Sequence, residues 1–198
     1  MSPQESVDHF RALAQRDPAA HRADLACSLN QLGIALLTGG RKTEALAAAR
    51  EAVDTYRVLA QESREATLPG LAMSLHNLGN ALRGLGRKTE AQRAAHEAVA
   101  LYHALSATDP QAFGLHLASS LAGLGATLDD TTARAETLRL VEVSLESLWP
   151  SVERDPQAAS TAVTMLFELA LDLSDALGRA PSAALLARGR AFKRWLGR

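Results

Sequence analysis

Aromatic residues, cysteine, net charge and long apolar runs are all scarce in this 198-residue chain. Aromatic residues make up only 4% of it, although 47% of its residues are hydrophobic and most of these are Ala and Leu. That balance favours helices packed through small side chains, because a sheet protein needs more β-branched and aromatic residues. We therefore expect an all-α fold with enough apolar residues for a sizeable core.

The other absences limit the classes of function. A single cysteine, Cys27, excludes an intramolecular disulfide, and a net charge of −1 gives no general attraction to nucleic acid or to an anionic membrane. The N-terminus has no basic stretch followed by an apolar run, and no apolar run reaches the ~18 residues of a membrane span. A cytoplasmic protein without cofactors is the expectation.

One segment of the sequence occurs twice. Residues 25–36 and the following Gly-Arg-Lys-Thr-Glu-Ala at 40–45 return, with few changes, as residues 71–82 and 86–91. Gly33, Gly79 and Gly125 are spaced 46 residues apart (79 − 33 and 125 − 79). Self-similarity at a fixed period indicates a repeat protein.

This register divides the chain into units. We expect a half-repeat at residues 3–15, three repeats at about 17–62, 63–108 and 109–154, and a degenerate C-terminal capping repeat at 155–198. No internal linker or low-complexity segment interrupts them. The sequence therefore predicts a single domain over residues 1–198.

Each repeat reads as an antiparallel helix pair. Leucines at 25, 29, 32 and 36 have helical spacing, and Gly39-Gly40 should end that first helix before a second runs over about 42–61. Asp-Pro pairs at 17, 109 and 155 supply an N-cap and a first helical residue at one phase of the repeat. The second repeat has Ser63-Arg64 there and Pro69 later, so we expect its first helix to start near residue 68 after a longer connection.

These residues resemble a known repeat family. The pattern Leu-x-x-Leu-Gly-x-x-Leu, followed by Gly-Arg-x-x-Glu-Ala and Ala-x-x-Ala, is similar to the tetratricopeptide repeat. It occurs at Leu29, Leu32, Gly33, Leu36, Gly40, Glu44, Ala45 and Ala52, and 46 residues later. The period exceeds the usual ~34 and resembles the longer-helix variety of kinesin light chain and bacterial regulatory proteins. The resemblance implies a right-handed α-solenoid of about nine helices.

The resemblance also implies a role for the mid-helix glycines and a place for the binding surface. Gly33 and Gly79 would let the partner helix approach closely, opposite Ala45 and Ala91. A partner would bind on the concave surface formed by the first helix of each pair. Transfer by the 46-residue register gives a partner-binding groove with these residues: Asn30, Ile34, Leu37, Met73, His76, Asn80, Arg83, Asp129, Glu168 and Asp172.

The acidic end of this proposed lining is open to two interpretations. Glu168 and Asp172 are four residues apart on a helix with no Lys or Arg between residues 156 and 177, so like charges repel there. A basic peptide of a partner would relieve them, and so would the chain's own cations between 188 and 194, or water. The basic stretch 188–198 itself could contact an acidic partner, or simply cap the last helix. A metal site at Asp129, Asp130, Glu168 and Asp172 lacks the ligand spacing of a calcium loop.

No catalytic constellation is present, because Cys27 has no neighbouring His and no phosphate-loop or zinc-protease pattern is complete. The leading hypothesis is a non-catalytic adaptor or regulatory module that binds a peptide or protein segment. Self-association through Val7, Phe10 and Leu13 of the half-repeat is an alternative, as is a piece of a larger regulator. An enzyme ranks last.

Overall fold

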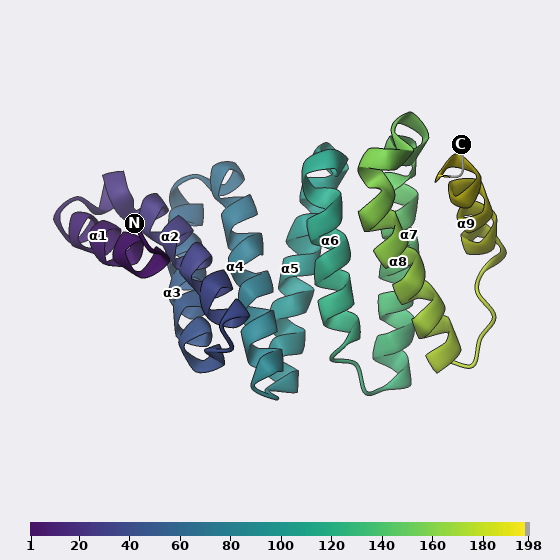
Figure 1. The fold of residues 1–198 in the computed structure, drawn as a ribbon, viewed down its shortest axis with the longest axis horizontal. Helices are drawn as coiled ribbons and strands as arrows, with labels where there is room; N and C mark the ends of the chain where they lie inside the picture. Colours follow the sequence, from purple (N-terminus) through teal and green to yellow (C-terminus); the bar gives the residue numbers. More distant parts are fainter. Residues whose placement is uncertain (197–198) are drawn as a thin grey trace. The chain divides into compact units, whose positions relative to one another are not determined.

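A computed structural model describes residues 1–196, apart from the side chains of Arg64 and Leu196. Within that part the fold is all-α, with nine helices and no strand, as the composition predicts (Figure 1). The helices are α1 (Pro3–Arg16), α2 (Pro18–Thr38), α3 (Lys42–Glu62), α4 (Arg64–Gly84), α5 (Lys88–Thr108), α6 (Pro110–Gly125), α7 (Thr131–Arg154), α8 (Pro156–Ala176) and α9 (Ala183–Leu196).

The chain forms two compact units, residues 1–101 and 102–198, and the division falls within α5. In the first unit α1 packs on α2, α2 on α3, and α3 on α4. In the second, α6 packs on α7 and α8, α7 on α8, and α8 on α9. This succession of neighbouring helices confirms the solenoid-type fold. The assignment of the whole chain to a single domain stays a prediction.

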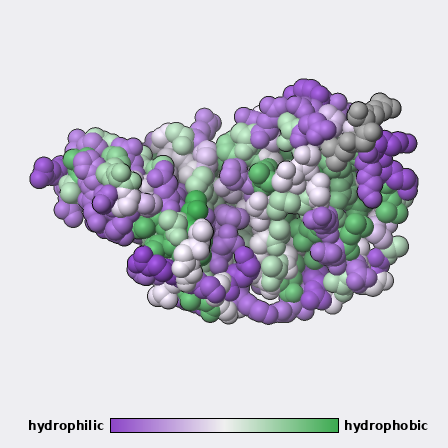
Figure 2. Space-filling model, viewed as in Figure 1, coloured by the Kyte–Doolittle hydropathy of each residue, from purple (hydrophilic) through white to green (hydrophobic). Residues whose placement is uncertain are grey.

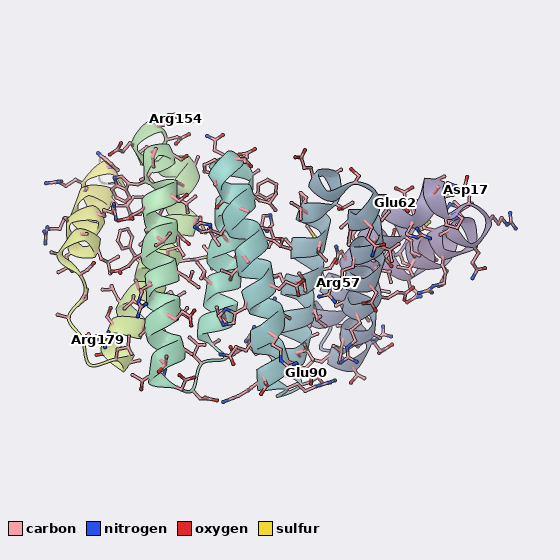
Figure 3. All side chains as sticks on the ribbon, turned by 180° about the vertical axis from the view of Figure 1, so that it is seen from behind. Asp17, Arg57, Glu62, Glu90, Arg154 and Arg179 are labelled. Carbon is pink, nitrogen blue, oxygen red and sulfur yellow. The ribbon has the colours of Figure 1, made fainter. Side chains whose placement is uncertain are left out.

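The Asp-Pro pairs start helices as predicted. Asp17, Asp109 and Asp155 each accept a hydrogen bond from the backbone N–H three residues later, at 3.1, 3.0 and 3.0 Å. Such a bond satisfies one of the helix's free N–H groups, and proline at the next position lacks an N–H that would otherwise need a partner. Asp17 is labelled at the turn between α1 and α2 (Figure 3).

The start of α4 differs from the prediction. The helix begins at Arg64 rather than near residue 68, and Ser63 alone separates it from α3, so there is no longer connection. Pro69 lies inside α4. As the sixth residue of α4, Pro69 lacks the N–H that would donate to the carbonyl of Glu65, and the helix still continues to Gly84. The missing Asp-Pro pair therefore changes the cap and leaves the helix in place.

Positive backbone angles mark the turns between paired helices. Gly40 and Gly86 have φ of 72° and 73°, in the left-handed region that favours glycine. Gly178, at the same phase in the fourth repeat, has φ of 62°. The third repeat has Thr132 there, and it makes the turn differently: α6 ends at Gly125, and Asp130 caps α7 through the N–H of Ala133 at 2.8 Å. Gly178 is a repeat signal that the sequence interpretation missed.

The half-repeat is part of the core. Val7 is fully buried in a cluster with leucines of α2, and Phe10 packs against the same cluster. Phe10 and Leu13 are half-buried. Much of the apolar face suggested for self-association is therefore packed against α2, and self-association through it stays a prediction.

The two mid-helix glycines differ: the expected close approach of the partner helix is wrong for Gly33, whereas at Gly79 the backbone of α5 lies within van der Waals distance. A Cβ added at Gly33 would meet nothing within 4 Å. At Gly79 the nearest atom would be the carbonyl oxygen of Ala91 at 3.5 Å, an ordinary van der Waals distance. Both positions have room for a methyl group.

We therefore expect Gly33→Ala to stabilise the protein by about 0.5–1 kcal/mol, since Ala in a helix loses less backbone entropy on folding than Gly. The same change at Gly70 should destabilise it, because its Cβ would lie 2.2 Å from the Cζ atom of Tyr56. Urea unfolding of the two variants measures these opposite changes in the free energy of unfolding. A loss of stability in Gly33→Ala would restore the close-approach interpretation.

Tyr102 makes the stability of the second unit sensitive to pH in the alkaline range. Its side chain is 2% exposed, and burial raises the pKa of its phenol to about 12. Its ring stacks on His116 with centroids 5.3 Å apart. The folded-state pKa exceeds the unfolded value near 10. The neutral phenol therefore contributes fully to the free energy of unfolding below pH 10, and this contribution declines as the pH rises toward 12.

We expect the wild type to lose about 1 kcal/mol of unfolding free energy between pH 9 and pH 11 relative to Tyr102→Phe, which has no phenol to ionise. Denaturant unfolding of both proteins at several pH values measures this. Parallel pH profiles for the two proteins would contradict the assignment to Tyr102.

Candidate functional site

A polar strip runs along α4 in the first unit. Three of its predicted groove residues are linked: Asn80 Nδ2 lies 2.9 Å from His76 Nε2, and Arg83 donates to Asn80 Oδ1 at 3.2 Å. Met73, His76 and Asn80 are half-buried and Arg83 is exposed. The strip keeps a mixed set of donors and acceptors at the surface of the helix.

The α2 positions of the predicted groove differ from one another. Ile34 is 46% exposed, a large value for an isoleucine, whereas Leu37 is half-buried against the core. Asn30 is only 3% exposed, and its Nδ2 donates to the backbone oxygen of Gly70 at 3.3 Å. Asn30 therefore joins α2 to α4 and has no surface to offer a partner, which corrects its place in the groove.

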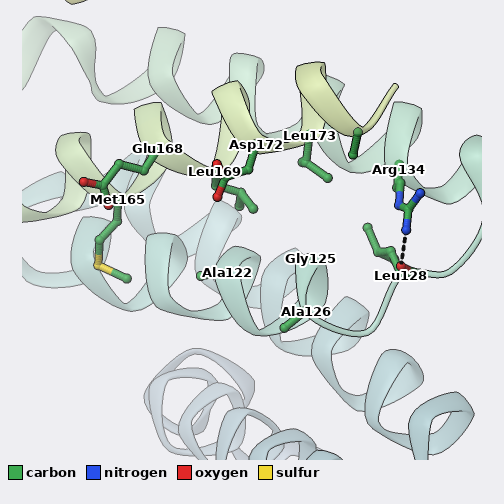
Figure 4. A pocket seen from close by; sticks show the side chains of 11 residues that line it. Ala122, Gly125, Ala126, Leu128, Arg134, Met165, Glu168, Leu169, Asp172 and Leu173 are labelled. Atoms are coloured by element: carbon green, nitrogen blue, oxygen red, sulfur yellow. Dashed lines mark hydrogen bonds between the residues drawn. The ribbon is translucent and has the colours of Figure 1, made fainter. Parts of the chain in front are cut away.

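A groove lies between α6 and α8 in the second unit (Figure 4). It has a volume of about 450 Å³. Its floor is apolar, with Leu128, Leu169 and Leu173 among its lining residues, and Glu168, Asp172 and Arg134 supply the charges. Six of its residues stand at positions that the 46-residue register transfers to the binding surface: Ala122, Ala126, Met165, Glu168, Asp172 and Ala176. Apolar surface over α6 to α8 is visible in Figure 2, with hydrophilic residues around it.

The charges of the groove are unbalanced. Glu168 and Asp172 are exposed on one face of α8, and within residues 1–196 neither carboxylate has an ion-pair partner. Arg134 donates to the backbone oxygen of Leu128 at 3.2 Å, so its guanidinium is held by the loop after α6. Two carboxylates against one cation leave this groove net negative.

The cations of α9 do not neutralise these carboxylates. Arg188 instead pairs with Glu146 of α7 at 3.3 Å, and its guanidinium lies 5.7 Å from the ring centroid of Trp149. Trp195 packs beside Trp149, with centroids 5.5 Å apart. These contacts support the capping interpretation for the described part of the basic stretch. Arg198, its last cation, lies outside the described residues.

Asp129 does not line the groove, although it is exposed in the loop between α6 and α7. The next residue, Asp130, is the N-cap of α7 and is accounted for by that role. Among residues 1–196 no three His, Cys, Asp or Glu side chains come together in a way that could hold a metal ion. No helix in the described part is long and apolar enough to cross a membrane.

Cys27 is exposed on α2, and its hydrogen-bonding neighbour is an amide rather than a base. Its sulfur accepts a weak hydrogen bond from Gln31 Nε2 at 3.9 Å. A nucleophilic cysteine needs a base or a cation beside it to form the thiolate. Cys27 therefore has the surroundings of an ordinary surface residue on α2.

Ion pairs between successive second helices are the feature that sequence reasoning missed. Arg11 of α1 donates to Glu51 of α3 at 2.8 Å, and Arg57 of α3 donates to Glu97 of α5 at 2.8 Å. Figure 3 labels Arg57. The sequence contained a signal for these pairs, because Arg and Glu stand 40 residues apart in both and the second pair follows the first by one repeat. His103 and Val143 occupy the third place, where no such pair can form.

Two similar pairs are found at the helix starts. Arg41 donates to Glu44 at 2.7 Å and Arg87 to Glu90 at 2.7 Å, and each arginine lowers the pKa of its glutamate. These are the Arg and Glu of the repeated Gly-Arg-x-x-Glu-Ala segment. Their conservation between the copies is thus explained by local helix-start chemistry and needs no partner.

Comparison with known proteins agrees with the repeat register. A family model described as tetratricopeptide repeat matches residues 25–62 and 71–110, which cover most of α2–α3 and of α4–α5. No curated protein matches the chain. Tetratricopeptide repeats generally mediate protein–protein interaction and are typically non-catalytic. Residues 25–62 and 71–110 are thus two tetratricopeptide repeats, and the helices around them follow the same paired pattern.

Proposed function

We propose that this chain is a non-catalytic interaction module that holds a positively charged segment of a partner protein in the groove between α6 and α8. The observation that carries the proposal is the groove itself, which combines an apolar floor with two carboxylates that form no ion pair within residues 1–196. Apolar floor residues would supply affinity, and Glu168 and Asp172 would set the preference for Lys or Arg.

The geometry favours an extended segment. The groove is shallow and lined by two helices, α6 and α8, so a bound chain can run along them while its cationic side chains meet successive carboxylates. Glu168 and Asp172 are one helical turn apart, about 6 Å, which suits basic residues at alternate positions of an extended peptide. The polar strip on α4 is proposed as a second contact surface for the partner.

Affinity capture from native lysate tests the acidic groove. The wild type is compared with Glu168→Gln/Asp172→Asn and with Glu136→Gln/Glu153→Gln, which removes two exposed carboxylates from α7 outside the groove. We expect proteins retained by the wild type and by the α7 control to be lost from the groove variant. Added salt should weaken their retention, since exposed charges are screened. Identical retained proteins on all three baits would overturn the assignment.

The strip on α4 has its own test. Asn80→Ala/Arg83→Ala removes its amide and its cation and leaves the buried leucines of α4 unchanged. We expect a captured partner to bind this variant about tenfold or more weakly, with an unchanged unfolding transition. Unchanged affinity would remove α4 from the binding surface and leave the α6–α8 groove as the site.

A further inference from the structure

The last helix pair differs from the earlier ones at one crossing. In the second repeat, a Cβ built on Gly79 of α4 would lie 3.8 Å from the Cβ of Ala94 of α5, so two small residues face each other there. Two repeats later, 92 residues along the chain (171 − 79 and 186 − 94), the corresponding residues are Leu171 of α8 and Leu186 of α9. Two leucines cannot occupy the space of a glycine and an alanine.

The consequence is an open, apolar groove between α8 and α9. Leu185 and Phe192 fasten α9 to the core, with exposures of 3% and 4%. Leu171 and Leu186 remain 45% and 42% exposed, and both line a groove of about 450 Å³ together with Phe167. Large exposed apolar side chains that share one groove mark an interaction surface more strongly than scattered ones do.

The charges around this groove are divided between its two helices. On α8, Glu168 and Asp175 lie about one turn to either side of Leu171. On α9, Arg190 and Lys193 follow Leu186 at four and seven residues, on the same helix face. All four are exposed, and none has an ion-pair partner among the described residues. One rim is therefore acidic and the other basic.

We propose that a second copy of this chain occupies the groove, through a two-fold pairing of the α8–α9 faces. In such a pairing each copy presents the same surface, so the surface must be complementary to itself. The α8–α9 face meets that condition, because the acidic rim of one copy meets the basic rim of the other. Leu171 and Leu186 of both copies then fill the opening that their own bulk creates, and the four helices form a bundle.

Charge complementarity selects this occupant over others. A purely acidic helix would be repelled by Glu168 and Asp175, and a purely basic one by Arg190 and Lys193. A partner must carry both signs on either side of an apolar strip, and the chain's own α8–α9 face has that arrangement. The pairing needs no other protein, and it shares Glu168, but neither leucine, with the α6–α8 groove.

Sedimentation velocity of the full chain over a wide range of concentration tests the pairing. We expect the wild type to form a dimer and Leu171→Gln/Leu186→Gln to dimerise about a hundredfold or more weakly. The matched control is Val143→Gln, which removes a 47% exposed apolar residue of α7 and should leave the dimer intact. Circular dichroism confirms that each variant is folded.

A charge exchange gives the sharper result. Glu168→Lys/Asp175→Lys makes both rims basic, and Arg190→Glu/Lys193→Glu makes both acidic, so each variant alone should be monomeric. Mixed together they should form a heterodimer, and added salt should weaken it. A monomeric wild type, a dimer that survives the two leucine substitutions, or two charge variants that fail to combine would each overturn the proposal. A monomeric wild type would mean that something other than a second copy occupies the groove.

Discussion

Asn30→Asp is expected to lower the free energy of unfolding by about 3–5 kcal/mol, although it changes a single atom. Asn30 is 3% exposed, and its amide group donates to the carbonyl oxygen of Gly70. An aspartate there has no proton to donate when ionised, and its charge would lie beside an oxygen with the same partial charge. The deficit should shrink in acid, because burial raises the carboxyl pKa and the protonated form carries no charge.

Asn80→Asp provides the matched control. Asn80 lies on the surface strip of α4, where its oxygen already accepts from Arg83, so a carboxylate gains an attractive neighbour. We expect a change of less than about 0.5 kcal/mol. Urea unfolding of both variants at neutral and acidic pH makes the comparison. Equal stabilities would mean that Asn30 is accessible to solvent and would return it to the proposed binding surface.

Leu75→Ala is expected to cost about 3–4 kcal/mol, because it leaves a cavity in the packing of α4. Leu75 is 1% exposed and packs in a cluster with Val53, Leu71 and Ala98. Leucines stand at the same phase in the first and third repeats, and Leu29 and Leu121 are equally buried. The repeated leucine is thus a core position in each of the first three repeats.

The control for this cavity is Leu85→Ala, which removes the same atoms from a side chain that is 37% exposed just after α4. Its cost should stay below about 1 kcal/mol. Thermal and urea unfolding of both variants, followed by far-ultraviolet circular dichroism, give the two values. Similar costs at the two positions would show that Leu75 is not the packing centre of its repeat.

Most of the fold could be predicted because the same local sequence signals occur in successive repeats. The Asp-Pro caps, the leucines at helical spacing and the turn glycines are all local signals, and they recur at one phase. Where a signal changed, the prediction failed. Ser63 in place of Asp-Pro suggested a longer connection, yet α4 is helical from Arg64 onward.

The surface was harder to predict than the fold, because exposure depends on neighbouring helices. Asn30 and Asn80 are both amides on first helices, and nothing local tells that one is covered by α4 while the other reaches solvent. The opening between α8 and α9 likewise follows from two substitutions 15 residues apart (186 − 171) on facing helices. The residue pattern of one helix alone does not predict which side chain of a second helix lies opposite.

In the proposed binding mode, one helix has a buried face that builds the repeat and an exposed face that binds a partner. Unfolding free energy and partner affinity, both measured for Leu166→Ala and for Glu168→Gln/Asp172→Asn, separate the two faces of α8. Leu166 is 0% exposed, and the two carboxylates line the α6–α8 groove. We predict that the first variant loses about 3 kcal/mol of stability and the second loses affinity alone. Unchanged affinity in the second variant, with the partner still bound by the protein, would contradict the account.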